Sequence, residues 1–306
     1  MELIKPGTQI DFVGKIKWAI GFSWLLILIG LASVLARGGL NYGIDFAGGT
    51  MVQVRFAQKP PIGEIRDAIT PLGAGDATIQ DFGTSASGAG SEFIIRFPLA
   101  AVEVPDLSKK LGDALLAKFG AGNVEVLRVE TVGPRVGSEL RVRAVLAVLF
   151  ATVMMGIYLW FRFEWRFGLG AAIALLHDVL ITAGALSLFH YEFDLTIVAA
   201  LLTVVGFSVN DTVIVSDRIR ENMRKSRRES LRAIINSSIN ETLSRTILTT
   251  GTAIMVLLAL FFLGGNVING FAFALLIGFT IGTYSSIYVA SPIVLFFERS
   301  SARRRR

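Results

Sequence analysis

Two ionisable residues inside long apolar segments are the strongest candidates for chemistry in this sequence. Asp211 lies in the segment 206–218, near the end of an apolar run, 195–215, that is long enough to cross a bilayer. A carboxyl group at that depth is unfavourable unless it faces a bundle interior or a wet cavity and has a partner. We therefore predict that Asp211 is a functional residue with a counter-ion elsewhere in the chain.

Arg245, at the start of the next apolar segment, is the candidate partner. The two spans are joined by the polar segment 217–240, so they must be antiparallel. Each residue lies one to two helical turns from that segment, about 6 to 9 Å at 1.5 Å per residue. An acid and a base at equal depth can neutralise one another. Burial favours the neutral carboxyl and a nearby Arg245 favours the ionised one, so a small movement could bind or release a proton. The alternative is a permanent ion pair that only fixes helix packing.

Further polar residues in the apolar segments are weaker candidates. His177 and Asp178 lie near the middle of the third segment. A buried histidine beside an aspartate could relay protons or could simply hydrogen-bond across helices. Residues that could line a wet path around Asp211, or pack at tight helix interfaces, are Asn210, Ser208, Thr246 and Thr249. Gly278 and Gly282 have the spacing of a helix-packing motif.

The elements that must position these residues are six apolar segments, each long enough to span a membrane. They are residues 18–36, 142–161, 167–189, 195–215, 243–263 and 267–297. Residues 34–36 resemble a signal-peptidase site, but the preceding apolar run exceeds the usual signal core of about 7 to 15 residues. We expect that run to remain as the first span. The prediction is an α-helical integral membrane protein with six transmembrane helices.

Lys and Arg are distributed asymmetrically around the spans, and this predicts the orientation. They are frequent before the first span, in the basic loop 217–240 and in the tail 299–306, whereas the short connections 190–194 and 264–266 contain none. Both termini are therefore predicted to be cytoplasmic. Orientation also explains the net charge of +6 better than nucleic-acid binding does. The expected parts are residues 1–37 with the first span, an extracytoplasmic domain at 38–139, spans two to six at 140–298 and the tail.

The segment 38–139 has the pattern of a small α+β domain. Residues 50–56 alternate as a strand does, and Pro60-Pro61 precedes apolar residues at helical spacing, with Gly73 as the stop. Two strands at 77–82 and 92–97, a helix beginning at Pro105 and a last strand at 124–132 complete the order βαββαβ. This is the ferredoxin-like order, which indicates nothing specific about function.

Several classes of site are disfavoured. The sequence has no cysteine, so disulfides and thiolate metal sites are excluded, and two histidines far apart leave little for a metal centre. No GxSxG, HExxH or phosphate-binding GxxxxGK[ST] motif occurs. We therefore expect neither an enzyme nor a bound cofactor, and transport-type coupling is favoured over hydrolysis.

An ordered set of motifs resembles the SecF family, the membrane subunits of the bacterial protein translocase. Single motifs of this kind are not specific, but the ordered set covers nearly the whole chain. The motifs are GIDFAGGT at 43–50, VGPRVG at 132–137, LHDV at 176–179, the segment 206–218 with REN at 220–222, and TLSRT at 242–246.

The resemblance implies a role in protein export. SecF proteins pair with the paralogous SecD, whose six spans complete a bundle like that of the resistance-nodulation-division transporters. The pair works in the bacterial inner membrane beside the SecY channel, on the side away from the SecA motor, and is thought to use the proton gradient to draw unfolded preproteins outward. The family's proton-conducting acid and arginine correspond to Asp211 and Arg245.

The resemblance suggests a mechanism, and two other functions remain as alternatives. Protonation of Asp211 would loosen its pairing, shift the spans and swing the outer domain, which would grip or release the exported chain. One alternative is half of a proton-driven small-molecule or lipid transporter, for which an outer domain of about one hundred residues is small. The other is a non-transporting assembly subunit, in which Asp211 and Arg245 would be dispensable to ion movement.

Overall fold

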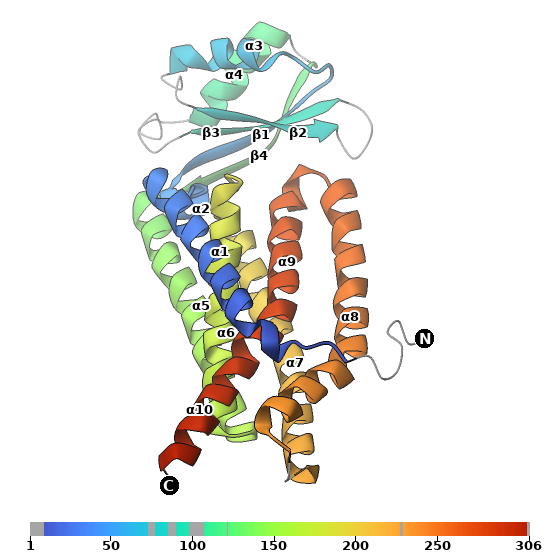
Figure 1. The fold of residues 1–306 in the computed structure, drawn as a ribbon. Helices are drawn as coiled ribbons and strands as arrows, with labels where there is room; N and C mark the ends of the chain where they lie inside the picture. The colour runs from blue at the N-terminus through green and yellow to red at the C-terminus, as the bar shows by residue number, and fades with distance from the viewer. Residues whose placement is uncertain are drawn as a thin grey trace.

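A bundle of membrane-length helices carries a separate α/β domain at one end (Figure 1). The structure is a computed structural model that describes residues 9–72, 77–84, 90–97, 107–120, 122–226 and 229–304. In this part of the chain six helical segments are long and apolar enough to cross a membrane, which confirms the six predicted spans. They are α1 (Ile16–Ala36, after the 3-10 turn η1, Val13–Lys15), α5 (Pro134–Arg162), α6 (Trp165–Leu188), α7 (Leu195–Lys225), α8 (Leu231–Leu263), and α9 (Asn266–Ser285) with its continuation.

The last span changes its winding near the middle of the bundle. After α9 comes a π-helical turn, η4 (Ser286–Ala290), and then α10 (Ser291–Arg304). The Ser291 hydroxyl donates to the Ser286 carbonyl at 2.9 Å across this turn. π-turns inside helices occur frequently at functional sites.

Helices α6, α7 and α9 form the centre of the bundle, and they are the most buried of the six spans. Large apolar side chains such as Trp18, Phe150 and Met255 face outward from α1, α5 and α8. Close packing at the centre depends on glycine: a Cβ on Gly278 of α9 would lie 2.1 Å from the Val204 side chain of α7. Gly278 and its neighbour one turn on, Gly282, are therefore packing residues, as their spacing predicts.

Two boundaries differ from the sequence-based expectation. Helix α5 begins at Pro134, so the α/β domain ends at Val132 rather than at residue 139. Pro134 starts the helix because its missing N–H is not needed in the first turn. The basic segment 217–240 is largely helical, since α7 continues to Lys225 and α8 begins at Leu231.

The segment 217–240 was predicted to be a loop from its polar composition alone. The extended end of α7 is held by ion pairs at helical spacing, in which Glu221 contacts both Arg218 and Lys225. The hydroxyl of Ser230 accepts from the Ala233 N–H and caps α8. Only residues 226–230 connect the two helices.

The α/β domain has the predicted order βαββαβ. Its strands are β1 (Gly49–Phe56), β2 (Thr78–Thr84), β3 (Ser91–Phe97) and β4 (Val124–Val132), in the spatial order β2-β3-β1-β4 with antiparallel neighbours. Helices α3 (Ile62–Ile69), extended by the turn η2 (Thr70–Leu72), and α4 (Leu107–Phe119) cover the face of the sheet that points away from the bundle (Figure 1). The core includes Val52, Val54, Ile65, Phe93, Phe97, Leu111 and Leu115. The predicted helix stop at Gly73 and start at Pro105 lie outside the described residues.

A short segment joins α1 to the sheet and is fastened to the start of α7. It contains the one-turn helix α2 (Ile44–Ala47). The Gly43 N–H donates to the Phe193 carbonyl at 2.8 Å, and the Phe193 N–H donates to the Asn41 carbonyl at 2.7 Å. Asp45 Oδ2 accepts from the Leu195 N–H at 3.0 Å. The base of the α/β domain is therefore hydrogen-bonded to the N-terminal end of α7.

Gly48 and Gly49 make the turn from this segment into β1. Their φ angles are +77° and +134°, in the region that favours glycine. A Cβ on Gly49 would also lie 2.4 Å from the Phe97 carbonyl oxygen. The local backbone therefore requires glycine at position 49.

Candidate functional site

Asp211 lies at the meeting point of three helices. Its side chain is fully buried on the inner face of α7. Asp211 Oδ2 accepts hydrogen bonds from the hydroxyl of Thr283 on α9 at 3.0 Å and from that of Thr250 on α8 at 3.4 Å. These two hydroxyls are 2.7 Å apart. One carboxylate oxygen thus links α7 to both neighbouring helices.

The second oxygen of the Asp211 carboxyl, Oδ1, has no partner in the part of the chain that the structure describes. Among the described residues, Asp211 Oδ1 and the hydroxyls of Thr212 and Thr246 are buried without a hydrogen-bond partner. Buried polar atoms without partners are unfavourable and are normally satisfied by a protein group, a proton or water. Binding a proton would give Oδ1 a hydrogen that it could donate. The site is therefore suited to taking up and releasing a proton.

The predicted ion pair between Asp211 and Arg245 does not form in this structure. Their depths do match: Asp211 lies 14 residues before Lys225, and Arg245 lies 14 residues after Leu231. Arg245 is nevertheless exposed, and within the described part of the chain it forms neither a hydrogen bond nor an ion pair with Asp211. It acts on the carboxyl only as a charge through space. Sequence spacing sets the depth of a residue in the span. Successive side chains also point about 100° apart around the helix axis, and the sequence analysis did not predict which way Arg245 points.

The threonine that reaches Asp211 also differs by one position from the prediction. The hydroxyl of Thr249 donates to the Arg245 carbonyl of its own helix, whereas Thr250 contacts the carboxyl. Thr242, Thr246 and Thr250 are all buried. Their spacing of four residues places them on one face of α8, a signal that the sequence contained.

His177 and Asp178 belong to a second buried cluster. Asp178 is fully buried and His177 is 6% exposed. Asp178 Oδ1 lies 2.9 Å from His177 Nδ1, and Asp178 Oδ2 accepts from the hydroxyls of Ser208 at 2.6 Å and Ser285 at 2.8 Å. His177 Nε2 lies 3.0 Å from the hydroxyl of Ser23. This cluster joins α1, α6, α7 and α9.

The structure does not bring Asn210 into either cluster. Asn210 is exposed on α7, and its role in a proton path stays a prediction. The residues missed from the sequence are Ser23, Thr250, Thr283, Ser285 and Tyr284, whose hydroxyl lies 3.1 Å from that of Ser23. Their hydroxyls could have been noted in apolar segments, but serine and threonine are common at helix interfaces, so composition alone does not distinguish them.

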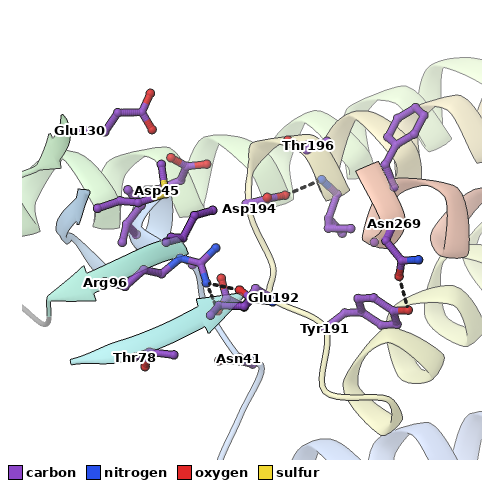
Figure 2. A pocket seen from close by; sticks show the side chains of 18 of the residues that line it. Asn41, Asp45, Thr78, Arg96, Glu130, Tyr191, Glu192, Asp194, Thr196 and Asn269 are labelled. Carbon is purple, nitrogen blue, oxygen red and sulfur yellow. Dashed lines mark hydrogen bonds and ion pairs between the residues drawn. The ribbon is translucent and has the colours of Figure 1, made fainter. Parts of the chain in front are cut away.

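A cavity of about 960 Å³ separates the open face of the sheet from the rim of the bundle (Figure 2). Arg96 of β3 crosses it to Glu192, in the α6–α7 connection, with a nitrogen–oxygen distance of 2.5 Å. Burial raises the pKa of Glu192, and Arg96 opposes that shift. Burial likewise raises the pKa of Asp194, which caps α7 by accepting from the Ile197 N–H at 2.8 Å. Arg96 and Glu192 are therefore a direct contact between domain and bundle.

The comparisons with known proteins decide the family. Residues 112–300 match the family described as "protein export membrane protein SecD/SecF, C-terminal", and residues 34–60 match the SecD/SecF GG motif. The protein translocase subunit SecF of Magnetococcus marinus is 49% identical over 99% of this chain and 97% of its own length. The chain belongs to the SecF family. SecF of Escherichia coli O157:H7 is 42% identical over 96% of this chain and 90% of its own.

Solved structures of SecDF share this fold. The crystal structure of SecDF, a translocon-associated membrane protein from Thermus thermophilus, is 38% identical with a TM-score of 0.82 over 96% of the chain. SecDF in a super-membrane-facing form gives a TM-score of 0.71 at 39% identity over 99% of the chain. This SecF-family chain spans 39% and 40% of those two longer chains. The match at 34–60 includes Gly48 and Gly49, and the match at 112–300 includes both buried clusters except Ser23.

Proposed function

We propose that this chain is an accessory subunit of Sec protein export that uses the proton gradient, through Asp211, to promote late steps of preprotein translocation. The observation that carries the proposal is the fully buried Asp211 carboxyl, which joins α7 to α8 and α9 while its Oδ1 has no partner among the described residues. Taking up a proton there changes the hydrogen bonds of three helices at once. The energy source is the gradient rather than a bound cofactor.

Helix α7 connects this site to the α/β domain. Asp211 lies 16 residues from Leu195, a distance of about 24 Å along the helix axis. Leu195 and Phe193, two residues before it, hold the segment 41–45 that leads into the domain. Each proton that crosses the membrane releases about 2.3 kcal/mol per 100 mV, enough to bias a two-state movement of the domain.

A SecD-type subunit is the partner that the exposed side of the bundle requires. Arg245 is exposed on α8 well inside the apolar span, and an arginine facing lipid at that depth is unfavourable. The flanking Ile247, Leu248 and Met255 are also exposed. A second helical bundle over this face would shield Arg245 and leave it near Asp211. The joined SecDF chains of the solved structures support this arrangement.

Family membership supports a proposal for the remaining partners and for the location. We propose that the chain acts beside the SecY channel and its SecA motor on unfolded preproteins, in the bacterial inner membrane. Both termini would be cytoplasmic and the α/β domain extracytoplasmic, in agreement with the distribution of Lys and Arg.

The test measures gradient-dependent completion of protein export. Vesicles contain the channel, its motor, the SecD-type partner and this chain, either unchanged or as Asp211→Asn. The matched control is Asp217→Asn, the same chemical change at an exposed position of the same helix. We expect Asp211→Asn to assemble normally and to lose the stimulation by the gradient, and Asp217→Asn to keep it. Full stimulation with Asp211→Asn would exclude the carboxyl as the coupling group.

A further inference from the structure

We propose that His177 and Asp178 form a second proton-binding site, in which the bound proton holds α1 against α9. The inference deepens the proposed function, and it rests on that function only for the part this proton plays in export. The occupancy of the site itself is a property of the chain that can be measured without export.

The site is a chain of hydrogen bonds that ends on a backbone carbonyl. From His177 Nε2 it runs to the Ser23 hydroxyl at 3.0 Å and from there to the Tyr284 hydroxyl at 3.1 Å. Tyr284 donates to the Ala19 carbonyl oxygen at 2.5 Å. A carbonyl can only accept, so it fixes the direction of every bond that precedes it.

The direction of these bonds determines the protonation of the pair. Because Tyr284 gives its one proton to Ala19, Ser23 must donate to Tyr284, and His177 Nε2 must then carry a hydrogen and donate to Ser23. The contact of 2.9 Å between His177 Nδ1 and Asp178 Oδ1 needs a further proton, on either atom. The pair therefore holds one proton more than a neutral imidazole beside a carboxylate, and it is neutral overall.

The alternative protonation states each lose a hydrogen bond. With hydrogen on Nε2 only and an ionised Asp178, two lone pairs would face each other across 2.9 Å. With hydrogen on Nδ1 only, Ser23 would have to donate to Nε2, and its contact with Tyr284 would contain no hydrogen. Release of the proton therefore costs either the His177–Asp178 contact or one of the two bonds by which Tyr284 of α9 is held to Ser23 and Ala19 of α1.

The surroundings of the pair make it sensitive to this proton. Oδ2 of Asp178 accepts from Ser208 on α7 and Ser285 on α9, bonds that suit either form of the acid. The nearby titratable groups are Tyr284, whose ring centroid is 6.2 Å from that of His177, Tyr288 beyond it, and Asp211 one turn from Ser208. In the described residues neither His177 nor Asp178 contacts a Lys or Arg.

Helix α1 gives this proton a route to the α/β domain. It leads from Ser23 to the segment 41–45, which is fastened to the start of α7. A change in the contact between α1 and α9 would therefore act on the same base of the domain as a change at Asp211. The two buried carboxyls reach that base through different helices.

The composition of the chain makes the proton directly observable. It contains only two histidines, so His190→Gln leaves His177 as the only imidazole. The full chain with this substitution and with ¹⁵N-labelled histidine is assembled with its SecD-type partner in lipid vesicles, and nitrogen NMR and carboxyl infrared spectra are recorded at pH 7. We expect either an imidazolium, or hydrogen on Nε2 together with a protonated Asp178 carboxyl. Neutral His177 with hydrogen on Nδ1 and an ionised Asp178 would overturn the proposal.

A matched pair of variants separates this chain of bonds from general packing. Tyr284→Phe removes the acceptor beyond Ser23 and should weaken proton binding by the pair about tenfold, the effect of one hydrogen bond near a charged group. Ser33→Ala removes a different hydrogen bond between α1 and α6, the one to Ser187. It leaves the hydrogen bonds from His177 to Ala19 intact and should not change the protonation of His177. The proposal would be refuted if Tyr284→Phe left the protonation of His177 unchanged, or if Ser33→Ala altered that protonation as much as Tyr284→Phe does.

The spectra and the export assay can refute the second site and the proposed function separately. If Asp211→Asn keeps full gradient stimulation while His177 shows the expected protonation, the proposed function fails and the second site stands. If Asp211→Asn loses the stimulation while His177 is neutral with hydrogen on Nδ1, the second site fails and the proposed function stands.

Discussion

Two buried carboxyls lie on neighbouring helices, and their partners give them different roles. Both oxygens of Asp178 are hydrogen-bonded, whereas within the described residues only Oδ2 of Asp211 is. A fully bonded carboxyl can hold helices in place, and a partly bonded one is better able to exchange its proton. We therefore propose Asp211, rather than Asp178, as the group that exchanges its proton during transport.

The hydroxyl of Thr283 provides a test at the scale of the single residue. It donates the shorter of the two hydrogen bonds to Asp211, a bond that favours the ionised carboxyl. Thr283→Val should make the proton harder to release and reduce gradient-stimulated export several-fold. The control is Thr280→Val, because the hydroxyl of exposed Thr280 donates to the Leu276 carbonyl of its own helix and not to Asp211. Equal stimulation by both variants would show that this bond is not used.

The contact between α7 and α9 positions both carboxyls. Ser208 and Asp211 lie one turn apart on α7, and their partners Ser285 and Thr283 lie close together on α9. The two helices approach closely because glycine faces α7 at Gly278 and Gly282. The distance between these two helices therefore sets the geometry of both clusters.

Gly278→Ala tests the contact between these elements. The added Cβ would lie 2.1 Å from Val204 and should push α9 away from α7, at a cost of about 1 to 3 kcal/mol in the free energy of unfolding. Gly206→Ala, on α7 with no atom within 4 Å of the added Cβ, should be neutral or slightly stabilising. Thermal unfolding of the full chain in detergent, with the export assay beside it, measures both effects. A harmless Gly278→Ala would mean that the helices are not closely packed there.

At the scale of the whole molecule, the sheet of the α/β domain faces the bundle across a cavity, whereas the segment leading into β1 packs on the bundle through Phe46. Arg96 and Glu192 span this cavity, and the hydrogen bonds of the segment 41–45 lie at its edge (Figure 2). Interfaces with few apolar contacts permit movement of one domain relative to another. The arrangement is suited to a domain that follows the helices beneath it.

The pH dependence of this contact can be predicted from Glu192. Its pKa is raised above the ordinary value of 4.5, chiefly by burial, so the docked domain is most stable below that value and loses stability as pH rises through the raised pKa. Asp194 acts in the same direction. Because the chain has no cysteine, spin labels can be attached at Lys110→Cys and Leu263→Cys alone. The distance between the labels should be narrowly distributed at pH 4 and broaden towards pH 8.

Glu192→Gln should remove most of that broadening, because the side chain keeps its shape but no longer ionises. The control is Glu125→Gln, which removes an exposed partner of Arg55 inside the α/β domain and should leave the pH dependence as it is. If the distance broadens equally in Glu192→Gln, this carboxyl does not control the contact.

The sequence by itself determined the six spans, the βαββαβ order and the equal depths of Asp211 and Arg245. These are local properties: apolar length, alternation along a strand and the fixed rise of a helix can be read from neighbouring residues. The tertiary structure alone decided that Thr250 rather than Thr249 reaches Asp211, and that Arg245 is exposed instead of paired with it. It also joined Ser23 to His177 and Arg96 to Glu192, residues 154 and 96 positions apart. Such contacts depend on how each helix is rotated and packed, which no local pattern specifies.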